Sequence, residues 1–354
     1  MPCPQFKGNP MLSRRTLLQT IAASMVFLSL SERRAFAQFL FRPKEKRQPR
    51  LRENLFTENG RPLVGVSSGK DAEEMVDRAV SLIGGFEKLG ARGKTVLVKP
   101  NVVSGESSPA TTNPEVVAAV VRLLYKNGAK KVYVGDMSAL RTVSTRRNMT
   151  KNGILKAAEA AGAEVVIFED FEWYAVPLSG TEHIKEAYVT EWVFRADIIV
   201  NLPVVKTHRS ASYSITLKNF IGCTHLRQRP YLVNPARWEE LVAEFNAAYT
   251  PDINIVDATV SMIEGGPWEG TPEPTNLIIA SGDRVGADAV GLGLIKSFGK
   301  WEPVVSKPVW EQTQLKTAIS LGIGRPLGDI RLLKGEGDEK FEAIVKGIKE
   351  HTGL

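Results

Sequence analysis

Short apolar runs alternate along the chain with longer segments in which apolar residues recur at helical spacing. The short runs predict buried β-strands, and the longer segments predict amphipathic helices. Strands are expected at residues 63–66, 95–98, 131–134, 165–168, 198–200, 253–256 and 277–279, with a small β excursion near 184–189. Helices are expected at residues 71–89, 114–126, 154–161, 210–221, 238–248, 285–295 and 339–349. This alternation predicts an α/β fold with a mostly parallel sheet, helices on both faces and Rossmann-like layering.

The helix at 114–126 has the clearest boundaries. Asn113 is a suitable N-cap, Pro114 follows at the first helical position, and Asn127-Gly128 ends the segment. The first helical position tolerates proline, because an N–H group at this position would have no partner within the helix.

The composition of the 354 residues is that of an ordinary globular protein, with 43% hydrophobic and 24% charged residues. These values exclude a disordered chain, a collagen-like repeat and a disulfide-rich miniprotein. A single α/β domain is expected over residues 61–354.

The N-terminal 37 residues resemble an export signal. Ser13-Arg14-Arg15-Thr16-Leu17-Leu18 opens an apolar stretch over residues 17–30, and a small-x-small cleavage site ends at Ala37. The paired arginines favour the twin-arginine route, with an ordinary secretory signal or an uncleaved anchor as alternatives. The apolar stretch is shorter than the roughly 20 residues that span a bilayer, so no transmembrane segment is expected after cleavage. The expected location is periplasmic or exported, with the twin-arginine machinery as a partner.

The net charge of +7 comes from the N-terminal part of the chain. Residues 1–37 carry five basic residues and one acidic residue, and residues 38–53 carry six and two, which leaves −1 for residues 54–354. A nucleic-acid partner is not expected, because such a protein needs basic charge on a domain face. Residues 38–60 are predicted to be a basic linker or arm, either solvated or in contact with an anionic membrane surface.

The two cysteines limit the choice of cofactor. Only Cys223 remains if the segment that contains Cys3 is removed. No internal disulfide, no cysteine-ligated iron–sulfur cluster and no structural zinc site is then expected.

Polar side chains follow several of the predicted strands. In open α/β sheets the ligand crevice lies beyond the carboxyl ends of the strands, so these residues are expected to share one polar crevice. Each residue alone is equally typical of a turn or a helix cap. The expected substrate-binding residues are Lys99, Asn101, Lys206, Thr207, Asn219 and Ser281.

A small anionic ligand is the expected occupant of this crevice. If residues 210–221 form a helix, Lys206, His208 and Arg209 precede its N-terminus, where free N–H groups favour an anion. Ser214 and Lys218 would then lie one turn apart on this helix. The alternative is that Lys206 and Lys218 form structural salt bridges with Asp136 or Asp257.

Acid–base chemistry and metal binding are assigned to separate groups. His208, Lys218 and Asp136 are the candidate catalytic residues, and an imidazole is suited to proton transfer near neutrality. His225 is a weaker candidate, and Cys223 is either a nucleophile or an inert buried thiol. Hard cations need several oxygen ligands, which makes Asp257 and Glu264 the candidate ligands of a divalent metal. Asp283 and Asp288 complete the acidic set.

Seven ordered blocks resemble the domain-of-unknown-function family 362 over roughly residues 63–325. The blocks are Val98 to Asn101, Val134 to Asp136, Asn201 to His208, Leu217 to Gly222, Ile255 to Asp257, Glu264 to Pro267, and Ala280 to Asp283 with Asp288 to Gly291. The family's loop shows Pro-Lys-x-Lys, whereas Val204 replaces the first of these lysines here. Some members carry an added ferredoxin-like cysteine cluster, which this chain lacks. The resemblance implies family membership and does not name a reaction.

Two hypotheses about function follow from these observations. The first is an exported enzyme that acts on a small anionic substrate, with or without a divalent metal. The second is a non-catalytic protein that binds a ligand or serves an exported redox system.

Overall fold

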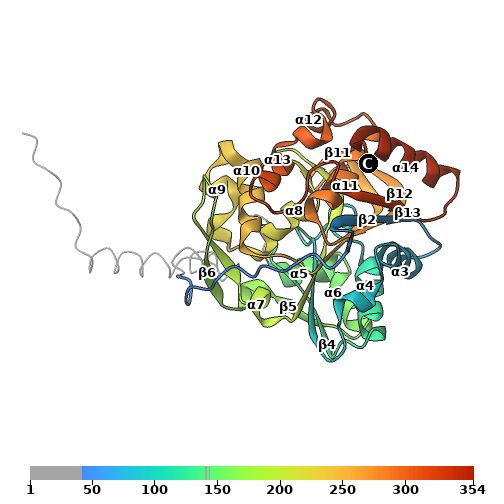
Figure 1. Cartoon of the computed structure of the whole chain (residues 1–354). Helices are drawn as coiled ribbons and strands as arrows, with labels where there is room; N and C mark the ends of the chain where they lie inside the picture. Colours follow the sequence, from blue (N-terminus) through green and yellow to red (C-terminus); the bar gives the residue numbers. More distant parts are fainter. Residues whose placement is uncertain (1–41, 140–141, 143) are drawn as a thin grey trace, which may run out of the picture. The chain divides into compact units, whose positions relative to one another are not determined.

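A mixed, mostly parallel sheet forms the centre of the computed structural model, which describes residues 42–139, 142 and 144–354 (Figure 1). The strands follow the order β1-β2-β12-β11-β8-β3-β4-β5, with β13 beside β2 and the β9–β10 pair beside β11. A separate hairpin consists of β6 and β7. The predicted α/β fold is confirmed, whereas the predicted export signal lies outside the described residues.

The strands and helices have the following bounds. The strands are β1 (Thr57–Glu58), β2 (Arg61–Ser67), β3 (Thr95–Pro100), β4 (Lys131–Asp136), β5 (Glu164–Ile167), β6 (Trp173–Pro177), β7 (Glu186–Thr190), β8 (Ile198–Leu202), β9 (Val204–His208), β10 (Ser212–Ser214), β11 (Ile253–Gly265), β12 (Gly270–Ser281) and β13 (Arg331–Lys334). The α-helices are α3 (Ala72–Leu82), α4 (Pro114–Lys126), α5 (Thr145–Lys151), α6 (Ile154–Ala160), α7 (Trp192–Arg195), α8 (Thr216–Asn219), α9 (Pro230–Val233), α10 (Trp238–Phe245), α11 (Arg284–Ser297), α12 (Glu302–Val305), α13 (Thr313–Ser320) and α14 (Glu339–Thr352).

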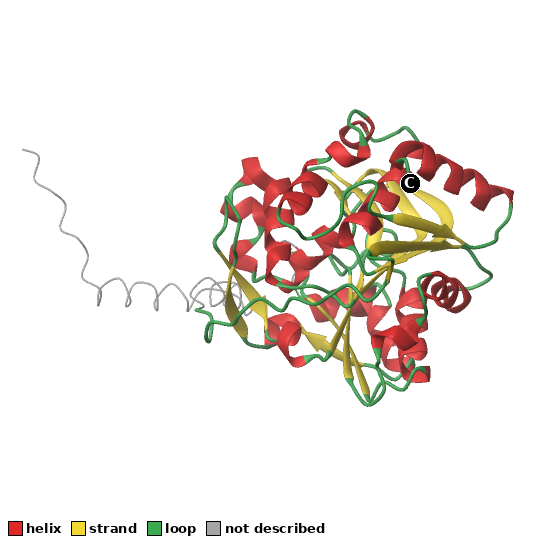
Figure 2. Ribbon diagram, in the orientation of Figure 1, coloured by secondary structure: helices red, strands yellow, loops and turns green. Residues whose placement is uncertain are grey.

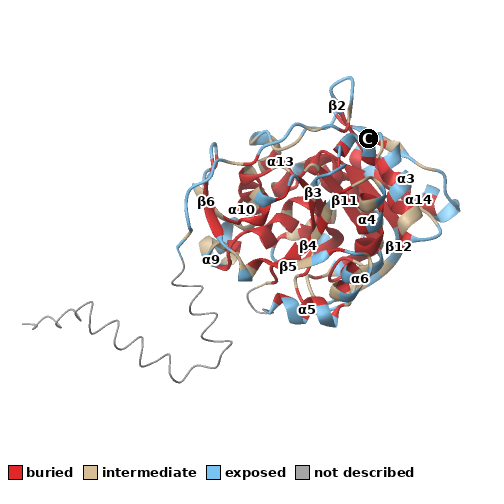
Figure 3. Cartoon of the chain, turned by 90° about the horizontal axis from the view of Figure 1, so that it is seen from below, coloured by how far each residue is buried: buried red, intermediate tan, exposed pale blue. Residues whose placement is uncertain are grey.

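Helices cover both faces of the sheet (Figure 2). On one face, apolar side chains of α3, α4 and α6 form one buried cluster with alternate residues of the central strands, such as Val98 and Val200. On the other face, α11 contacts β11 and β12, and α8 contacts β8. The central strands β3 and β8 are therefore buried, while exposed residues lie on the outer helix surfaces (Figure 3). Among the described helices, none has the length and apolar character that crossing a membrane requires.

The helix predicted at 114–126 is confirmed as α4. The Asn113 side chain accepts a hydrogen bond from the N–H of Glu115, and Pro114 occupies the first turn. The helix predicted at 71–89 is shorter than expected, since α3 ends at Leu82 and a separate 3-10 turn covers Phe86–Leu89. Gly84 and Gly85 both adopt positive φ between the two, which ends the helix.

The prediction of a helix over 210–221 is wrong. Residues 212–214 form strand β10, which pairs with β9, and the helix α8 begins only at Thr216. Ser214 and Lys218 therefore do not lie one turn apart on a helix. Lys206 and His208 belong to β9 rather than to a segment that precedes a helix N-terminus.

The last two predicted central strands are much longer than expected. β11 and β12 form one antiparallel hairpin, whose outer part is half exposed and rich in polar residues. Only the inner, mostly apolar and buried halves of these strands give a signal in the sequence. Because β12 runs against β11, its last residue, Ser281, pairs with Asn254 near the start of β11.

The described part of the basic arm, residues 43–60, is folded onto the protein. Lys44 and Arg47 donate backbone hydrogen bonds to carbonyl groups of β6, and the Arg50 N–H donates to the Ala248 carbonyl. The Arg50 side chain is 7% exposed, and its guanidinium forms an ion pair of 2.9 Å with Asp252 and donates to the Asp197 and Thr250 carbonyls. The prediction of a linker therefore does not hold for these residues.

Substitution of Arg50 tests whether the arm is part of the folded unit. Arg50→Met keeps much of the apolar stem but leaves the Asp252 carboxylate without its ion-pair partner. Loss of one partner of a buried pair costs about 3–5 kcal/mol. We expect the free energy of unfolding, measured by chemical denaturation, to fall by this amount. Arg52→Met, at an exposed position of the same arm, is the control and should change it by less than about 0.5 kcal/mol. Equal effects of the two variants would contradict an integral role for Arg50.

Candidate functional site

A cavity of about 360 Å³ lies beyond the carboxyl ends of β3 and β4, next to the end of β9. We call it the central cavity. Its lining includes six of the residues that the sequence predicts to share a crevice: Lys99, Asn101, Asp136, His208, Lys218 and Asn219. Residues separated by up to 120 positions in the chain are thus brought together, as the parallel strands predict.

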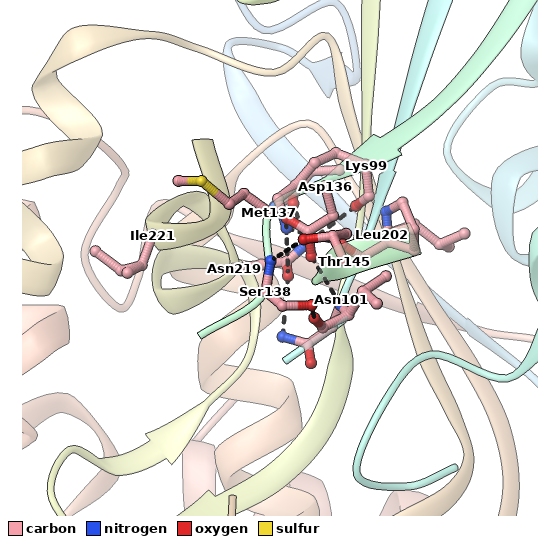
Figure 4. A network of polar contacts seen from close by, with 12 residues as sticks. Lys99, Asn101, Asp136, Met137, Ser138, Thr145, Leu202, Asn219 and Ile221 are labelled. Atoms are coloured by element: carbon pink, nitrogen blue, oxygen red, sulfur yellow. Dashed lines mark hydrogen bonds and ion pairs between the residues drawn. The ribbon is translucent and has the colours of Figure 1, made fainter. Parts of the chain in front are cut away.

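A buried ion pair forms the base of the central cavity. Lys99 Nζ lies 2.6 Å from Asp136 Oδ1, and the two side chains are 1% and 3% exposed. Figure 4 shows both side chains with Asn219 within one polar network. Lys99 Nζ also donates to the Pro100 carbonyl at 2.8 Å and to Asn219 Oδ1 at 3.1 Å. The other carboxylate oxygen of Asp136 accepts from the N–H of Val102 at 2.7 Å. Lys99 and Asp136 therefore satisfy each other and hold the surrounding backbone.

A row of buried polar residues, which includes the side-chain amides of Asn201, Asn219 and Asn254, extends this network across the sheet. Lys99, Asn201, Asn254 and Ser281 occupy matching register positions on β3, β8, β11 and β12. Asn219 Nδ2 donates to Asn201 Oδ1 at 2.8 Å, and Asn201 Nδ2 donates to Asn254 Oδ1 at 2.9 Å. Because buried amides are costly without partners, this row fixes the position of α8 over the sheet.

Lys206 is held behind the wall of the central cavity. The residue is 1% exposed, and its amino group donates to Asn101 Oδ1 at 3.0 Å, to the Pro267 carbonyl at 3.4 Å and to the Ala110 carbonyl. No described carboxylate forms an ion pair with Lys206. Burial, together with the nearby charges of Lys218 and Lys99, lowers the pKa of Lys206 well below its usual value.

Lys218 differs from both other lysines because its amino group is uncommitted. The residue lies on α8 and lines the central cavity, yet Nζ has no hydrogen-bond or ion-pair partner among the described residues. Burial, with Arg229 and Lys99 nearby, lowers the pKa of Lys218 to about 7. The expected alternative, structural salt bridges of Lys206 and Lys218 with Asp136 or Asp257, is therefore not found; Asp136 pairs with Lys99 instead.

His208 presents a hydrogen-bond donor to the cavity. Its Nδ1 accepts from the backbone N–H groups of Ser210 and Ala211 at 3.1 and 3.2 Å, so Nδ1 carries no proton. Burial and the charges of Lys218 and Lys206 lower the pKa of His208 well below 6.5. The imidazole is therefore neutral, with its proton on Nε2, and it can polarise a bound oxygen.

Arg229 and the aromatic side chains of the cavity, which form an aromatic wall, are not predicted from the sequence. Arg229, which is 4% exposed, lines the cavity, and its guanidinium donates to carbonyl groups of Met137, Ser138 and Ile221. Trp238, Tyr231 and Trp268 form much of the remaining lining. Trp238 stacks on Tyr231 with 5.4 Å between ring centroids. Arg229 belongs to no periodic segment and follows no predicted strand, so local pattern gives no signal for it.

The proposed metal ligands are not brought together. Asp257 accepts hydrogen bonds from the N–H of Asn113 and from Thr259, whereas Glu264 is exposed and bonded to Thr271. The two carboxylates are seven residues apart on one strand, roughly 20 Å at about 3.3 Å per residue, so they cannot share an ion. The described residues contain no group of three or more His, Cys, Asp or Glu suited to a metal.

Several other predicted residues lie outside the cavity lining. Ser281 Oγ donates to the Leu63 carbonyl, and Asp283 caps α11 through the N–H of Gly286. Thr207 is buried on β9 outside the lining, although its neighbour His208 lines the cavity. Burial raises the pKa of the Cys223 thiol to about 12, and burial beside Arg229 lowers the pKa of His225 to about 4. Neither of these two groups lines the cavity.

Asp288 on α11 holds the N-terminal end of α8 in position. Its carboxyl oxygens accept from the N–H groups of Thr216 and Leu217, the first residues of that helix. The Thr216 hydroxyl contacts both the Arg284 carbonyl and Asp288. Burial raises the pKa of Asp288 to about 7, although the hydrogen bonds that its carboxylate accepts from Thr216 and Leu217 oppose this shift.

The fold and the site define an α/β protein with a cation-lined cavity at the carboxyl ends of its parallel strands. The chain belongs to the family described as a domain of unknown function, DUF362, whose model matches residues 96–293. The thylakoid-associated protein sll1697 of Synechocystis sp. (strain ATCC 27184 / PCC 6803 / Kazusa) is 30% identical over 215 residues, which are 59% of this chain and 65% of that protein.

Among solved structures, the lactate racemase apoprotein from Thermoanaerobacterium thermosaccharolyticum resembles the chain with 12% sequence identity and a TM-score of 0.38. The superposition covers 80% of this chain and 85% of that chain.

Gly222 offers a direct test of the buried ion pair. A Cβ at this position would overlap Asp136 Oδ1 and lie 2.6 Å from Lys99 Nζ. Both atoms are fixed by their mutual contact, so we expect Gly222→Ala to lower the free energy of unfolding by about 1–3 kcal/mol. Gly335→Ala is the matched control, because its Cβ would find no atom nearer than 3.7 Å. Denaturation curves of both variants check the prediction. An unchanged free energy of unfolding for Gly222→Ala would refute the close packing of Gly222 against the ion pair.

The raised pKa of Asp288 predicts that the stability of the protein depends on pH. Its pKa is about 7 in the folded protein and near 3.8 when exposed, so the folded state holds an additional proton between these values. The free energy of unfolding therefore falls as pH rises from about 4 to about 7. Asp288→Asn cannot ionise and should lack this contribution, which is a few kcal/mol at about 1.4 kcal/mol per pKa unit.

Urea denaturation of the wild type and Asp288→Asn at several pH values measures this contribution. The difference between the two unfolding free energies should change across that range. Asp77→Asn, at an exposed position, should instead follow the wild type. Parallel profiles for the wild type and Asp288→Asn would show that Asp288 titrates normally.

Proposed function

We propose that the protein is an enzyme that binds a small anionic substrate in the central cavity, with Lys218 as its reactive group. The observation that carries this proposal is the imbalance of charge around the cavity. Lys99 is neutralised by Asp136, but Lys206, Lys218 and Arg229 have no carboxylate partner among the described residues. An anion would offset the repulsion between these groups.

Each part of the lining has a distinct task in this proposal. Lys218 Nζ and the Nε2–H of His208 have no described partner, so they would contact the anion directly. Arg229 Nε and the indole N–H groups of Trp238 and Trp268 also lack a hydrogen-bond partner among the described residues and add further donors to the lining. Arg229 and Lys206 supply positive charge from fixed positions, because carbonyl groups hold them. Donors fixed in advance in a site of low dielectric stabilise developing negative charge more strongly than water does.

Lys218 suits acid–base chemistry at neutral pH. With a pKa of about 7, its amino group is present in both protonated and neutral forms. A group with such a pKa can both donate and accept a proton at the operating pH. The candidate catalytic roles of His208 and Asp136 change accordingly: His208 becomes a neutral hydrogen-bond donor, and Asp136 the partner that holds Lys99.

Anion binding should weaken as Lys218 loses its proton. We expect the affinity for oxalate, acetate or inorganic phosphate, measured by isothermal titration calorimetry, to decrease as pH rises through about 7. Lys218→Met removes a charge-assisted hydrogen bond, worth about 1.5–3 kcal/mol, and should weaken binding at pH 6 by roughly tenfold or more. The affinity of this variant should also depend less on pH.

Lys156→Met is the control for this experiment, because Lys156 is exposed on α6 and has no partner among the described residues. It should bind like the wild type. The proposal fails if none of the three anions binds, or if Lys218→Met binds them as tightly as the control does.

A further inference from the structure

The three lysines around the central cavity use their amino groups in different ways. Lys99 is bound to a carboxylate, and Lys206 is bound to three oxygen acceptors behind the cavity wall. Lys218 alone among these three lines the cavity with an amino group that has no described partner. A lysine in this situation, partly desolvated and next to other cations, is the kind that forms covalent bonds with carbonyl compounds.

We propose that Lys218 forms an imine with the carbonyl carbon of a small oxo-carboxylate. The inference rests on the proposed function, since it names the class of anion and the reaction that the same site performs. An oxo-carboxylate matches two features of the cavity. Its carboxylate would offset the excess of positive charge, and its carbonyl carbon would react with the free amine.

The reaction balances without any further reagent. The lone pair of neutral Nζ forms a C–N bond with the carbonyl carbon, and the π electrons of the carbonyl move to its oxygen. One N–H proton moves to that oxygen, which gives a carbinolamine. The C–O bond then breaks, the hydroxyl group leaves as water with the second N–H proton, and the nitrogen lone pair forms the C=N bond.

The neighbours of Lys218 are suited to these steps. The positive charges of Arg229 and Lys99 favour the neutral amine that must attack, as the pKa of about 7 reflects. His208 lines the same cavity, and its Nε2–H can donate to the carbonyl oxygen as negative charge develops there. Arg229 provides a fixed positive charge for the carboxylate. The volume of about 360 Å³ is near the lower end for ligand cavities, which favours small oxo acids.

Other nucleophiles near the cavity do not meet these requirements. Lys206 lies outside the lining, and its hydrogen bonds occupy the amino group. Cys223 also lies outside the lining, and its buried thiol has a pKa of about 12, so it carries almost no thiolate at neutral pH.

Borohydride trapping tests the proposal on the full chain. The protein is incubated with pyruvate or acetoacetate, sodium borohydride is added, and the product is analysed by intact mass spectrometry and peptide mapping. We expect one reduced adduct for each protein molecule, located at Lys218. Lys218→Arg should retain most of the anion affinity of the wild type but give no adduct, because arginine keeps the charge without a nucleophilic amine. Lys156→Met should be labelled like the wild type.

The outcomes separate this inference from the proposed function. Calorimetry can show binding of pyruvate, acetoacetate or oxalate. If any of the three binds but neither pyruvate nor acetoacetate gives an adduct at Lys218, imine formation is refuted and anion binding stands. Labelling spread over surface lysines, or unchanged in Lys218→Arg, also refutes it. If no anion binds at all, both proposals fail.

Discussion

The ion pair between Lys99 and Asp136 determines how the rest of the site is arranged. It joins the carboxyl ends of β3 and β4, and each partner also holds a neighbouring segment: Asp136 holds the backbone at Val102, and Lys99 holds Asn219 on α8. A buried pair of this kind is weak evidence for stability in itself, but loss of one partner leaves a costly buried charge. The pair therefore acts mainly as a constraint on geometry, and α8 takes its position from it.

This constraint reaches Lys218 through the amide row. Asn219 is bonded to Lys99, Asn101 and Asn201, and Asn201 is bonded in turn to Asn254. Every amide in the row has a partner, and satisfied buried networks of this kind favour a single arrangement. Lys218 precedes Asn219 in the chain, so its backbone is fixed while its amino group stays uncommitted. The site thus joins a rigid base to one side chain whose amino group has no described partner.

Prediction from the sequence succeeds where the signal is local. The cap and the apolar spacing of residues 114–126 lie within one element, and the crevice follows from strand ends that face one way. It fails over residues 210–221, because Tyr213 and Leu217 have helical spacing but belong to β10 and α8. It fails for the Asp257 and Glu264 pair because the length of β11, which separates them, depends on pairing with β12.

The different roles of Lys99, Lys206 and Lys218 also cannot be predicted from the local sequence pattern. Lys99 and Lys206 each come directly after apolar residues within a strand, and nothing in the neighbouring sequence distinguishes an ion-paired lysine from one bonded to carbonyl groups. Only the three-dimensional partners distinguish them from Lys218. Arg229 shows the same limit, since its place in the cavity depends on contacts with Met137 and Ser138, about 90 residues away.

The cost of this arrangement indicates what the cavity selects. Burial of cations without counter-charges disfavours the folded state, and the lowered pKa values of Lys206 and Lys218 express that cost. A neutral occupant would leave the repulsion between these groups and Arg229 in place, and a cationic one would add to it. Under the proposed function, charge would therefore select anions of any shape. The aromatic side chains of Tyr231 and Trp238 would then limit their size, and the amine of Lys218 would decide which of them react.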